Sequence, residues 1–208
     1  MRSYIVSGIR SKSSKTKAGL FQLMSILDLI AYDKGDDKLA RIKEVRLAYH
    51  YQQLPFDIIK SSIGTFMLEV SRQSIKEKEA NPDLYQFLEG WYAYLDQTDA
   101  SILNAHLLFL VQLSAFIGFQ PDPNYQEGSI FDLLEGRFET EAHSAYFIDK
   151  EHSAIFYNLL NSDIRAIQEL NLNGSQRRVL LESLITYYRL HIDAFQPLKS
   201  MEVLREVL

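Results

Sequence analysis

Hydrophobic positions in the first fifty residues favour short β-strands. Apolar segments over residues 2–9, 20–32 and 39–47 are separated by polar, turn-forming stretches, although the second segment has a mixed period. The polar run 33–38 contains a glycine and suits a hairpin between the second and third segments. In the third segment the alternation shifts phase at Ile42, which indicates a β-bulge. We therefore expect three antiparallel strands.

Beyond Pro55 the hydrophobic period changes to that of helices. Five apolar residues repeat at the spacing of one helix face: Ile59, Ile63, Phe66, Met67 and Val70. Asn81 followed by Pro82 predicts the start of a second helix, because Asn caps free amides and Pro fits the first turn. Residues 100–117 are apolar nearly all round, so they predict a third helix at the centre of a bundle.

Most of the turn-forming residues lie in residues 120–149. Residues 130–133 and 137–139 are predicted to form two short strands around a turn at Gly136. Helices are then expected over residues 150–160, 164–170, 176–194 and 198–208, the last with Met201, Leu204 and Leu208 facing inward. The pattern as a whole predicts an α+β fold, with strands first and a mainly helical region after them.

Charge is distributed unevenly along the chain. The net charge is −5, but residues 1–50 hold ten Lys/Arg against five Asp/Glu, and the remaining 158 residues hold twelve against twenty-two. This asymmetry indicates a basic interaction face on an otherwise acidic protein, although a chance fluctuation in surface charge would give the same count. The chain has no cysteine, which excludes disulfides, thiolate zinc sites and cysteine nucleophiles. No apolar run is long enough to span a bilayer, so we expect a soluble intracellular protein.

The sharpest local feature is a run of four cations with no acid between them. Arg10, Lys12, Lys15 and Lys17 alternate with Ser and Thr, whose hydroxyls can also donate to phosphate oxygens. Cations of this density suit contacts to a nucleic-acid backbone, where each neutralised phosphate releases a counterion. Since nothing in the run reads base edges, binding is expected to be independent of sequence. The alternative is a solvated loop that charge keeps soluble.

Arg41 and Lys43 are expected to extend this positive surface along the third strand. Strand alternation places these two on one side and Arg46 on the other, unless the bulge intervenes. Protection of an exposed sheet edge by charge explains them equally well. Three aromatic residues are candidates for stacking on bases, though each is also suited to a core: Tyr4, Phe21 and Tyr32.

Enzymatic readings find little support. The five histidines are scattered, and the chain contains neither a Walker-type phosphate loop nor a Gly-x-Ser-x-Gly turn. His143 and His152 lie near several acids, but their spacing does not match a helical pair of metal ligands. His106 is expected to be a satisfied core residue of the third helix. We therefore expect no catalytic residues, no metal and no cofactor.

Several segments, taken in order, resemble the bacterial RecO family of recombination mediators. Residues 4–10, 20–29 and 42–47 are similar to the later strands and basic loop of its N-terminal OB-fold. Residues 109–122 are similar to its junction between a helix and an insertion, and residues 198–204 to its closing helix. The resemblance covers essentially the whole chain, and it depends on the order of the segments rather than on one strict motif.

The resemblance implies a partial OB-fold-like DNA-binding segment over residues 1–50 and a helical domain over residues 51–208 with its insertion at 120–149. The first two strands of the barrel are expected to precede Met1. Family members that bind zinc do so through four cysteines in the insertion, which this chain lacks, so aromatic contacts of Phe131, Phe138 and Tyr146 are expected to hold the insertion together.

The implied function is binding of single- and double-stranded DNA, strand annealing, and loading of the RecA recombinase onto DNA coated by single-strand binding protein. Implied partners are RecR and the acidic C-terminal tail of single-strand binding protein, which would dock in an apolar pocket of the helical domain. No membrane partner is expected, and the implied localisation is cytoplasmic and nucleoid-associated. The rival interpretation is a helical protein-interaction module whose basic N-terminus is incidental.

Overall fold

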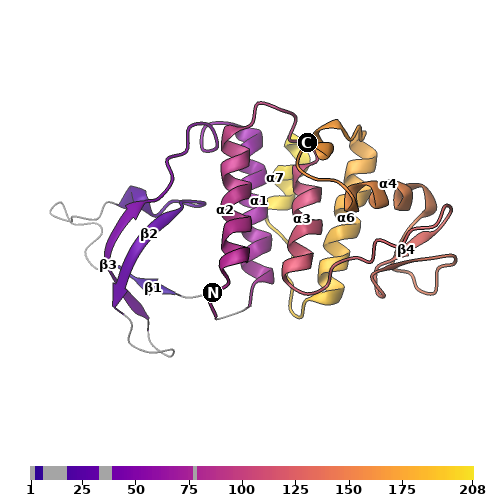
Figure 1. The fold of residues 1–208 in the computed structure, drawn as a ribbon, viewed down its shortest axis with the longest axis horizontal. Helices are drawn as coiled ribbons and strands as arrows, with labels where there is room; N and C mark the ends of the chain where they lie inside the picture. The colour runs from indigo at the N-terminus through magenta and orange to yellow at the C-terminus, as the bar shows by residue number, and fades with distance from the viewer. Residues whose placement is uncertain (1–2, 7–17, 33–38, 77–78) are drawn as a thin grey trace.

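The computed structural model describes residues 3–6, 18–32, 39–76 and 79–208. These residues form an α+β fold, as the hydrophobic pattern predicts. A small sheet lies at one end of the molecule, helices fill the middle, and a second small sheet lies at the other end (Figure 1). The first sheet consists of β1 (Tyr4–Ile5), β2 (Leu27–Tyr32) and β3 (Ala40–Leu47).

β3 is the middle strand of the first sheet, with β2 antiparallel on one side and β1 on the other. β1 runs parallel to β3, so the expectation of three antiparallel strands is wrong for this pair. The predicted strand over residues 20–32 is too long, because β2 begins only at Leu27. The preceding Met24 has a φ of 66°, which breaks the strand, and its carbonyl accepts a hydrogen bond from the Tyr51 hydroxyl at 2.8 Å.

The bulge predicted near Ile42 is confirmed. Ala31 of β2 lies opposite Ile42, whereas Ile30 lies opposite Glu44, so Lys43 is the extra residue on β3. A bulge of this kind reverses the alternation of side chains on one strand relative to its partner. The faces on which the β3 side chains lie therefore have to be assigned from the observed pairing.

Three helices follow the sheet: α1 (Ile58–Ser74), α2 (Pro82–Gln97) and α3 (Ala105–Phe116). Asn81 caps α2 by accepting a hydrogen bond from the Leu84 amide, with Pro82 in the first turn as predicted. α3 begins five residues later than expected but is buried along most of its length. No helix of the described ranges is both long and apolar enough to cross a membrane.

A buried polar junction joins the sheet to the helices. The Asp96 carboxylate, on α2, accepts hydrogen bonds from the backbone amides of Gln52, Gln53 and Leu54 at 2.8–3.0 Å. Burial alone would raise the pKa of Asp96, but these amide contacts outweigh it and lower the pKa below its usual value. The buried Lys60 ammonium donates to the side chain of Gln53 at 2.7 Å. The segment that leaves the first sheet is therefore fixed to the bundle.

The insertion forms the second sheet, from β4 (Ile130–Asp132), β5 (Arg137–Glu139) and the unpredicted β6 (Phe147–Ile148). Phe131 is fully buried and packs against the rings of Phe138, Phe156 and Tyr187. Aromatic contacts thus tie the insertion to the helices, as expected for Phe131 and Phe138. Tyr146 is half-exposed and makes no ring contact with another residue of the described chain, so it has no such role.

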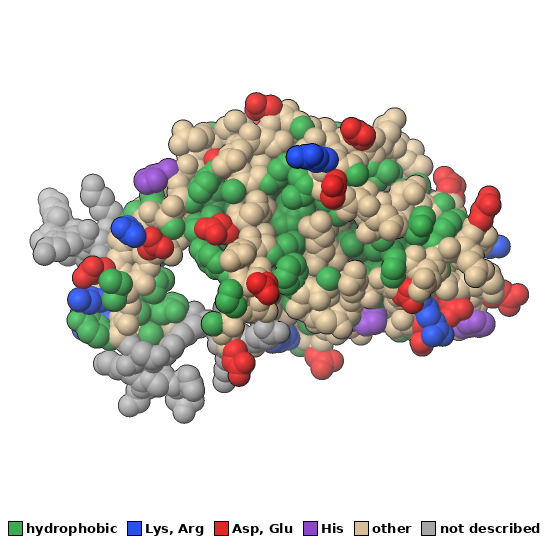
Figure 2. Space-filling view, in the orientation of Figure 1, with side chains coloured by type: hydrophobic (Ala, Val, Ile, Leu, Met, Phe, Trp, Pro, Cys, Tyr) green, Lys and Arg blue, Asp and Glu red, His purple; other side chains and the backbone are tan. Residues whose placement is uncertain are grey.

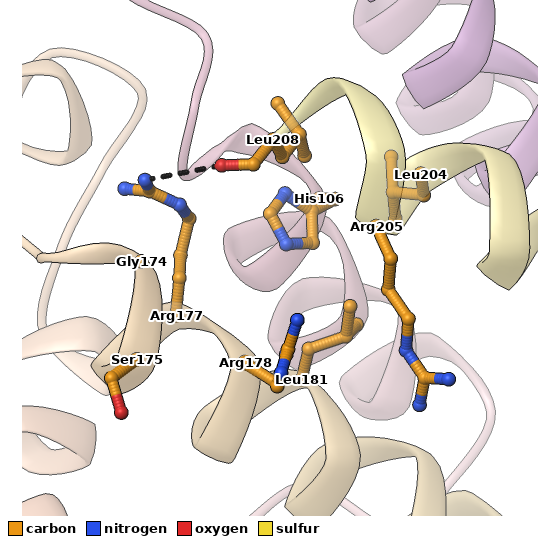
Figure 3. A pocket seen from close by; sticks show the side chains of 9 residues that line it. All are labelled: His106, Gly174, Ser175, Arg177, Arg178, Leu181, Leu204, Arg205 and Leu208. Carbon is orange, nitrogen blue, oxygen red and sulfur yellow. Dashed lines mark hydrogen bonds between the residues drawn. The ribbon is translucent and has the colours of Figure 1, made fainter.

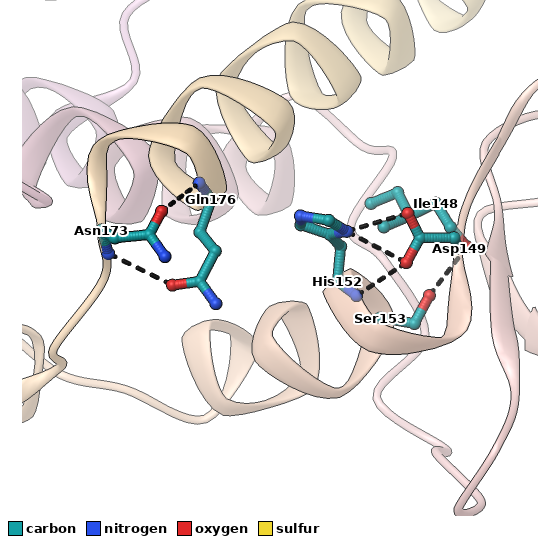
Figure 4. Close-up of polar contacts among 6 residues, drawn as sticks. All are labelled: Ile148, Asp149, His152, Ser153, Asn173 and Gln176. Atoms are coloured by element: carbon teal, nitrogen blue, oxygen red, sulfur yellow. Dashed lines mark hydrogen bonds and ion pairs between the residues drawn. The ribbon is translucent and has the colours of Figure 1, made fainter.

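Four helices close the chain: α4 (Lys150–Leu160), α5 (Ala166–Glu169), α6 (Gly174–His191) and α7 (Ser200–Val207). Figure 4 shows the capping side chains that begin α4 and α6. Asp149 accepts a hydrogen bond from the His152 amide, and Asn173 and Gln176 form a reciprocal capping box. On α7, Met201 and Leu204 are buried, as the amphipathic pattern predicts, and Leu208 is partly buried.

Candidate nucleic-acid interface and a basic pocket

The structure describes two of the six residues predicted to bind DNA. Arg41 and Lys43 lie on β3, and the side chains of both are exposed. The other four predicted residues lie outside the described residues: Arg10, Lys12, Lys15 and Lys17. The described part of the interface is therefore the surface of the first sheet.

The bulge at Lys43 brings Arg41 and Arg46 onto the same face of the sheet. Arg41 lies opposite Tyr32 and Arg46 lies opposite Asp28, and these two β2 residues are four apart, so they share a face. Simple alternation along β3 would have separated the two arginines. We call this surface the Arg41 face; its members on the three strands are Ile5, Asp28, Ile30, Tyr32, Arg41, Glu44 and Arg46.

Arg41 does not lie on a sheet edge. It is paired with Ile5 of β1 on one side and with Tyr32 of β2 on the other. Protection of an edge strand by charge therefore does not explain this arginine. The alternative considered from the sequence is thus wrong at this position.

Most of the charge on this surface is internally neutralised. Arg46 forms an ion pair with Asp28 at 3.0 Å, and Lys43 lies 3.5 Å from Glu44. Arg41 makes no ion pair with any residue that the structure describes. Figure 2 shows hydrophobic, Lys/Arg and Asp/Glu side chains next to one another at the sheet end of the molecule. Near Tyr32 the described members of the Arg41 face are Arg41, Ile5 and Ile30. The end of the Arg41 face near Tyr32 is therefore both cationic and apolar.

The three stacking candidates differ in their placement. Tyr32 is 56% exposed on the Arg41 face. Tyr4 is also exposed, but it pairs with Ala40 and therefore points to the opposite face. Phe21 is partly buried and lies outside the strands. Of these aromatic residues, Tyr32 alone stands next to the unpaired arginine.

A pocket of about 330 Å³ opens between α3, α6 and α7 (Figure 3). Its apolar lining comes from Leu181, Leu204 and Leu208. Three arginines also line it: Arg177, Arg178 and Arg205. The family resemblance implied an apolar pocket in the helical domain, but its residues could not be named from the sequence, because they come from three separate helices.

Two polar atoms of this pocket are buried and have no hydrogen-bond partner among the described residues: His106 Nδ1 and Arg177 Nε. Burial, together with the positive charge of Arg177, lowers the pKa of His106 to about 3, so the ring is neutral. His106 is thus a core residue as expected, but it is not fully satisfied.

The arginines differ in how far they are already engaged. Arg177 donates to the Leu172 carbonyl at 2.9 Å, and Arg205 forms an ion pair with Glu182 at 2.9 Å. Arg178 is exposed and makes no hydrogen bond or ion pair within the part of the chain that is described. A pocket with apolar walls and a free guanidinium suits a ligand that is both anionic and apolar.

The histidines form no metal site among the described residues. No group of three or more His, Asp or Glu side chains there is close enough to hold an ion. His152 Nδ1 lies 2.8 Å from the Asp149 carboxylate, which is a local contact within the capped first turn of α4 (Figure 4).

Comparisons with known proteins find the same family that the sequence segments resemble. A family model described as "Recombination protein O C terminal" matches residues 55–202. A protein named DNA repair protein RecO from Christiangramia forsetii is 34% identical, over 99% of this chain and 86% of its own length. Proteins of the same name from Flavobacterium psychrophilum and Phocaeicola vulgatus are each 35% identical, over 100% and 99% of this chain and 87% and 86% of their own lengths.

Proposed function

Because the chain belongs to the RecO family of DNA repair proteins, we propose that it is a non-enzymatic mediator that binds single- and double-stranded DNA without sequence preference. Its role in DNA repair and recombination follows from the family. In our proposal it promotes the annealing of complementary strands and helps to load RecA onto DNA coated by single-strand binding protein. Its proposed protein partners are single-strand binding protein and RecR.

We assign DNA binding to residues 1–50 and partner binding to residues 51–208. The observation that carries this assignment is the exposed Arg41, which has no carboxylate partner in the described structure. It lies within residues 1–50, which hold ten basic and five acidic residues. Arg10, Lys12, Lys15, Lys17 and Lys43 complete the proposed phosphate-binding set. Phosphate contacts of this kind give affinity that does not depend on base sequence.

The test is the salt dependence of DNA binding by a variant with Arg10, Lys12, Lys15 and Lys17 all changed to Ala. We expect its affinity to fall by orders of magnitude and its log–log salt slope to flatten by up to about 3–4 units. A matched control changes four exposed cations of the helical part to Ala and should bind nearly as well as the natural chain: Lys150, Arg165, Arg189 and Lys199.

If the control loses as much affinity as the fourfold variant, net charge rather than this segment drives binding. If the unaltered chain binds no DNA, the rival interpretation of a helical protein-interaction module replaces our proposal. Strand annealing, measured with the same variants, should fall together with DNA affinity.

The acidic tail of single-strand binding protein is proposed to dock in the pocket between α3, α6 and α7. Arg178 would attract its carboxylates, and the leucine walls would take an apolar side chain. An acidic peptide with an apolar last residue is the probe, with binding measured by fluorescence anisotropy. Arg178→Glu should abolish binding, whereas Arg189→Glu, the same charge change at an exposed site of the same helix, should not.

A further inference from the structure

A row of three exposed side chains crosses the first sheet at one level. The pairing places Ile5 of β1, Arg41 of β3 and Tyr32 of β2 directly beside one another, on the same face. Neighbouring strands lie about 4.8 Å apart, so these three side chains form one continuous surface. Ile30 extends it along β2 and is 55% exposed.

Tyr32 is available to a ligand. Its side chain makes no ring contact and no hydrogen bond with any residue in the described ranges. Leaving an aromatic ring more than half exposed forgoes the free energy of its burial. Arg41, which has no ion-pair partner in the described structure, lies beside Tyr32 on the neighbouring strand, and Ile30 lies two residues before Tyr32 on the same face. Ile5 lies on the far side of Arg41. The surface therefore offers stacking and charge together.

We propose that the Tyr32 ring stacks on a base of single-stranded nucleic acid while Arg41 holds the adjacent phosphate. This inference rests on the proposed DNA-binding function and names the form of nucleic acid that this surface takes. Stacking on aromatic rings beside a positive backbone contact is how proteins hold single strands without reading their sequence. In a duplex the faces of the bases are covered by their neighbours, so the ring has no partner there.

The charged residues of the Arg41 face determine which part of this face the nucleic-acid strand contacts. Asp28 is four residues from Tyr32 along β2, about 13 Å away at the rise of a strand, and Arg46 already neutralises it. Glu44 lies opposite Ile30 and near Lys43. The phosphate backbone is therefore confined to the end of the face that carries Arg41 and Tyr32. In the sequence, Ile5 at this end precedes Arg10, the first of the four clustered cations, by five residues.

The experiment compares Tyr32→Ala with Tyr32→Phe, which keeps the ring. The probes are an oligo-thymidine strand of about 16 nucleotides, a sugar–phosphate strand of the same length without bases, and a duplex. Tyr146→Ala is the matched control, because Tyr146 is 46% exposed but lies in the insertion, at the other end of the molecule. Circular dichroism and thermal midpoints establish that each variant is folded.

We expect Tyr32→Ala to bind oligo-thymidine on the order of 10-fold more weakly, with no change in salt slope. Its affinity for the duplex and for the strand without bases should be unchanged, and Tyr32→Phe and Tyr146→Ala should behave as the unaltered chain does. Arg41→Ala, in contrast, should lower the salt slope on the single strand by about 0.7.

Two results overturn the inference while leaving the proposed function intact. In the first, the unaltered chain binds in a salt-dependent way and Tyr32→Ala binds every probe as tightly as the unaltered chain does. This is the result expected if a partner protein, and not a base, covers the Tyr32 ring. The other is an equal loss on every probe, because a loss that persists without bases cannot come from stacking. If the unaltered chain shows no salt-dependent binding to any probe, the proposed function fails as well.

Discussion

Arg46 on β3 donates a hydrogen bond from Nε to one carboxylate oxygen of Asp28 on the neighbouring strand β2 at 3.0 Å, and its Nη2 forms an ion pair with the same oxygen at 3.0 Å. The two residues are direct partners in the antiparallel register. This pair removes one cation from the surface to which we assign DNA binding. Arg41, on the same face, is left without such a partner in the described structure, so the two arginines are not equivalent.

Replacing Asp28 with Asn should strengthen DNA binding, because it frees Arg46 to contact a phosphate. The log–log salt slope should steepen by up to about 0.9 on duplex DNA. Stability should change little, since exposed ion pairs contribute about 0.2–1 kcal/mol. Asp99→Asn makes the same charge change at an exposed site of the helical part. Equal gains in the two variants would show that net charge, and not release of Arg46, is responsible.

Asp96→Ala should detach the segment that links the first sheet to the helices. The substitution leaves the amides of Gln52, Gln53 and Leu54 without their acceptor. Hydrogen bonds to a charged group contribute about 1.5–3 kcal/mol each, so we expect a loss of at least about 3 kcal/mol in urea unfolding. A loss below about 0.5 kcal/mol, the usual effect of a surface change, would contradict the role given to this carboxylate.

His106 should make the protein less stable as the pH falls below neutrality. Its pKa is about 3 in the folded chain against an ordinary value near 6.5. Between these values the unfolded chain binds the extra proton, so the free energy of unfolding rises with pH and falls as the solution is acidified. From pH 7 to pH 5 the loss should be about 2 kcal/mol.

Urea unfolding of His106→Gln over the same pH range isolates this contribution. Between pH 7 and pH 5 the free energy of unfolding of the variant should fall by about 2 kcal/mol less than that of the unaltered chain. The carboxylates with lowered pKa values, such as Asp96 and Glu69, titrate below this range and do not contribute to it. An unchanged pH profile in the variant would mean that the ring does not remain neutral in the fold.

The aromatic cluster of the insertion should be essential to its stability. Phe131→Ala removes a fully buried ring that contacts Phe138, Phe156 and Tyr187, and should cost about 3–5 kcal/mol. Tyr146→Ala, at an exposed ring of the same insertion, should cost no more than about 0.5 kcal/mol. Comparable losses in thermal unfolding would show that the insertion is not held through Phe131.

Elements with a strong local signal could be predicted from the sequence. The apolar stripe from Ile59 to Val70 forms α1, and the Asn81–Pro82 pair begins α2, because periodicity and capping are properties of a single segment. The phase shift at Ile42 located the bulge for the same reason. The parallel pairing of β1 could not be predicted, because it depends on β1 lying beside β3 and not beside β2, the next strand along the chain. A two-residue strand carries no local signal for that choice.

Sites that combine distant segments could not be predicted residue by residue. The pocket that contains Arg178 draws on α3, α6 and α7, and no spacing in the sequence links them. The shared face of Arg41 and Arg46 depends on how β3 pairs with β2 around the bulge, so it required the observed register. The cluster from Arg10 to Lys17 is a local signal, and its part in DNA binding stays a prediction.

The most direct test of the central claim is the affinity of the unaltered chain for two unrelated single-stranded sequences of equal length over a series of salt concentrations. We predict closely similar affinities for the two sequences and one common, steep decline with salt, because the contacts are to phosphates. Affinity that is insensitive to salt, or that differs widely between the two sequences, would contradict it.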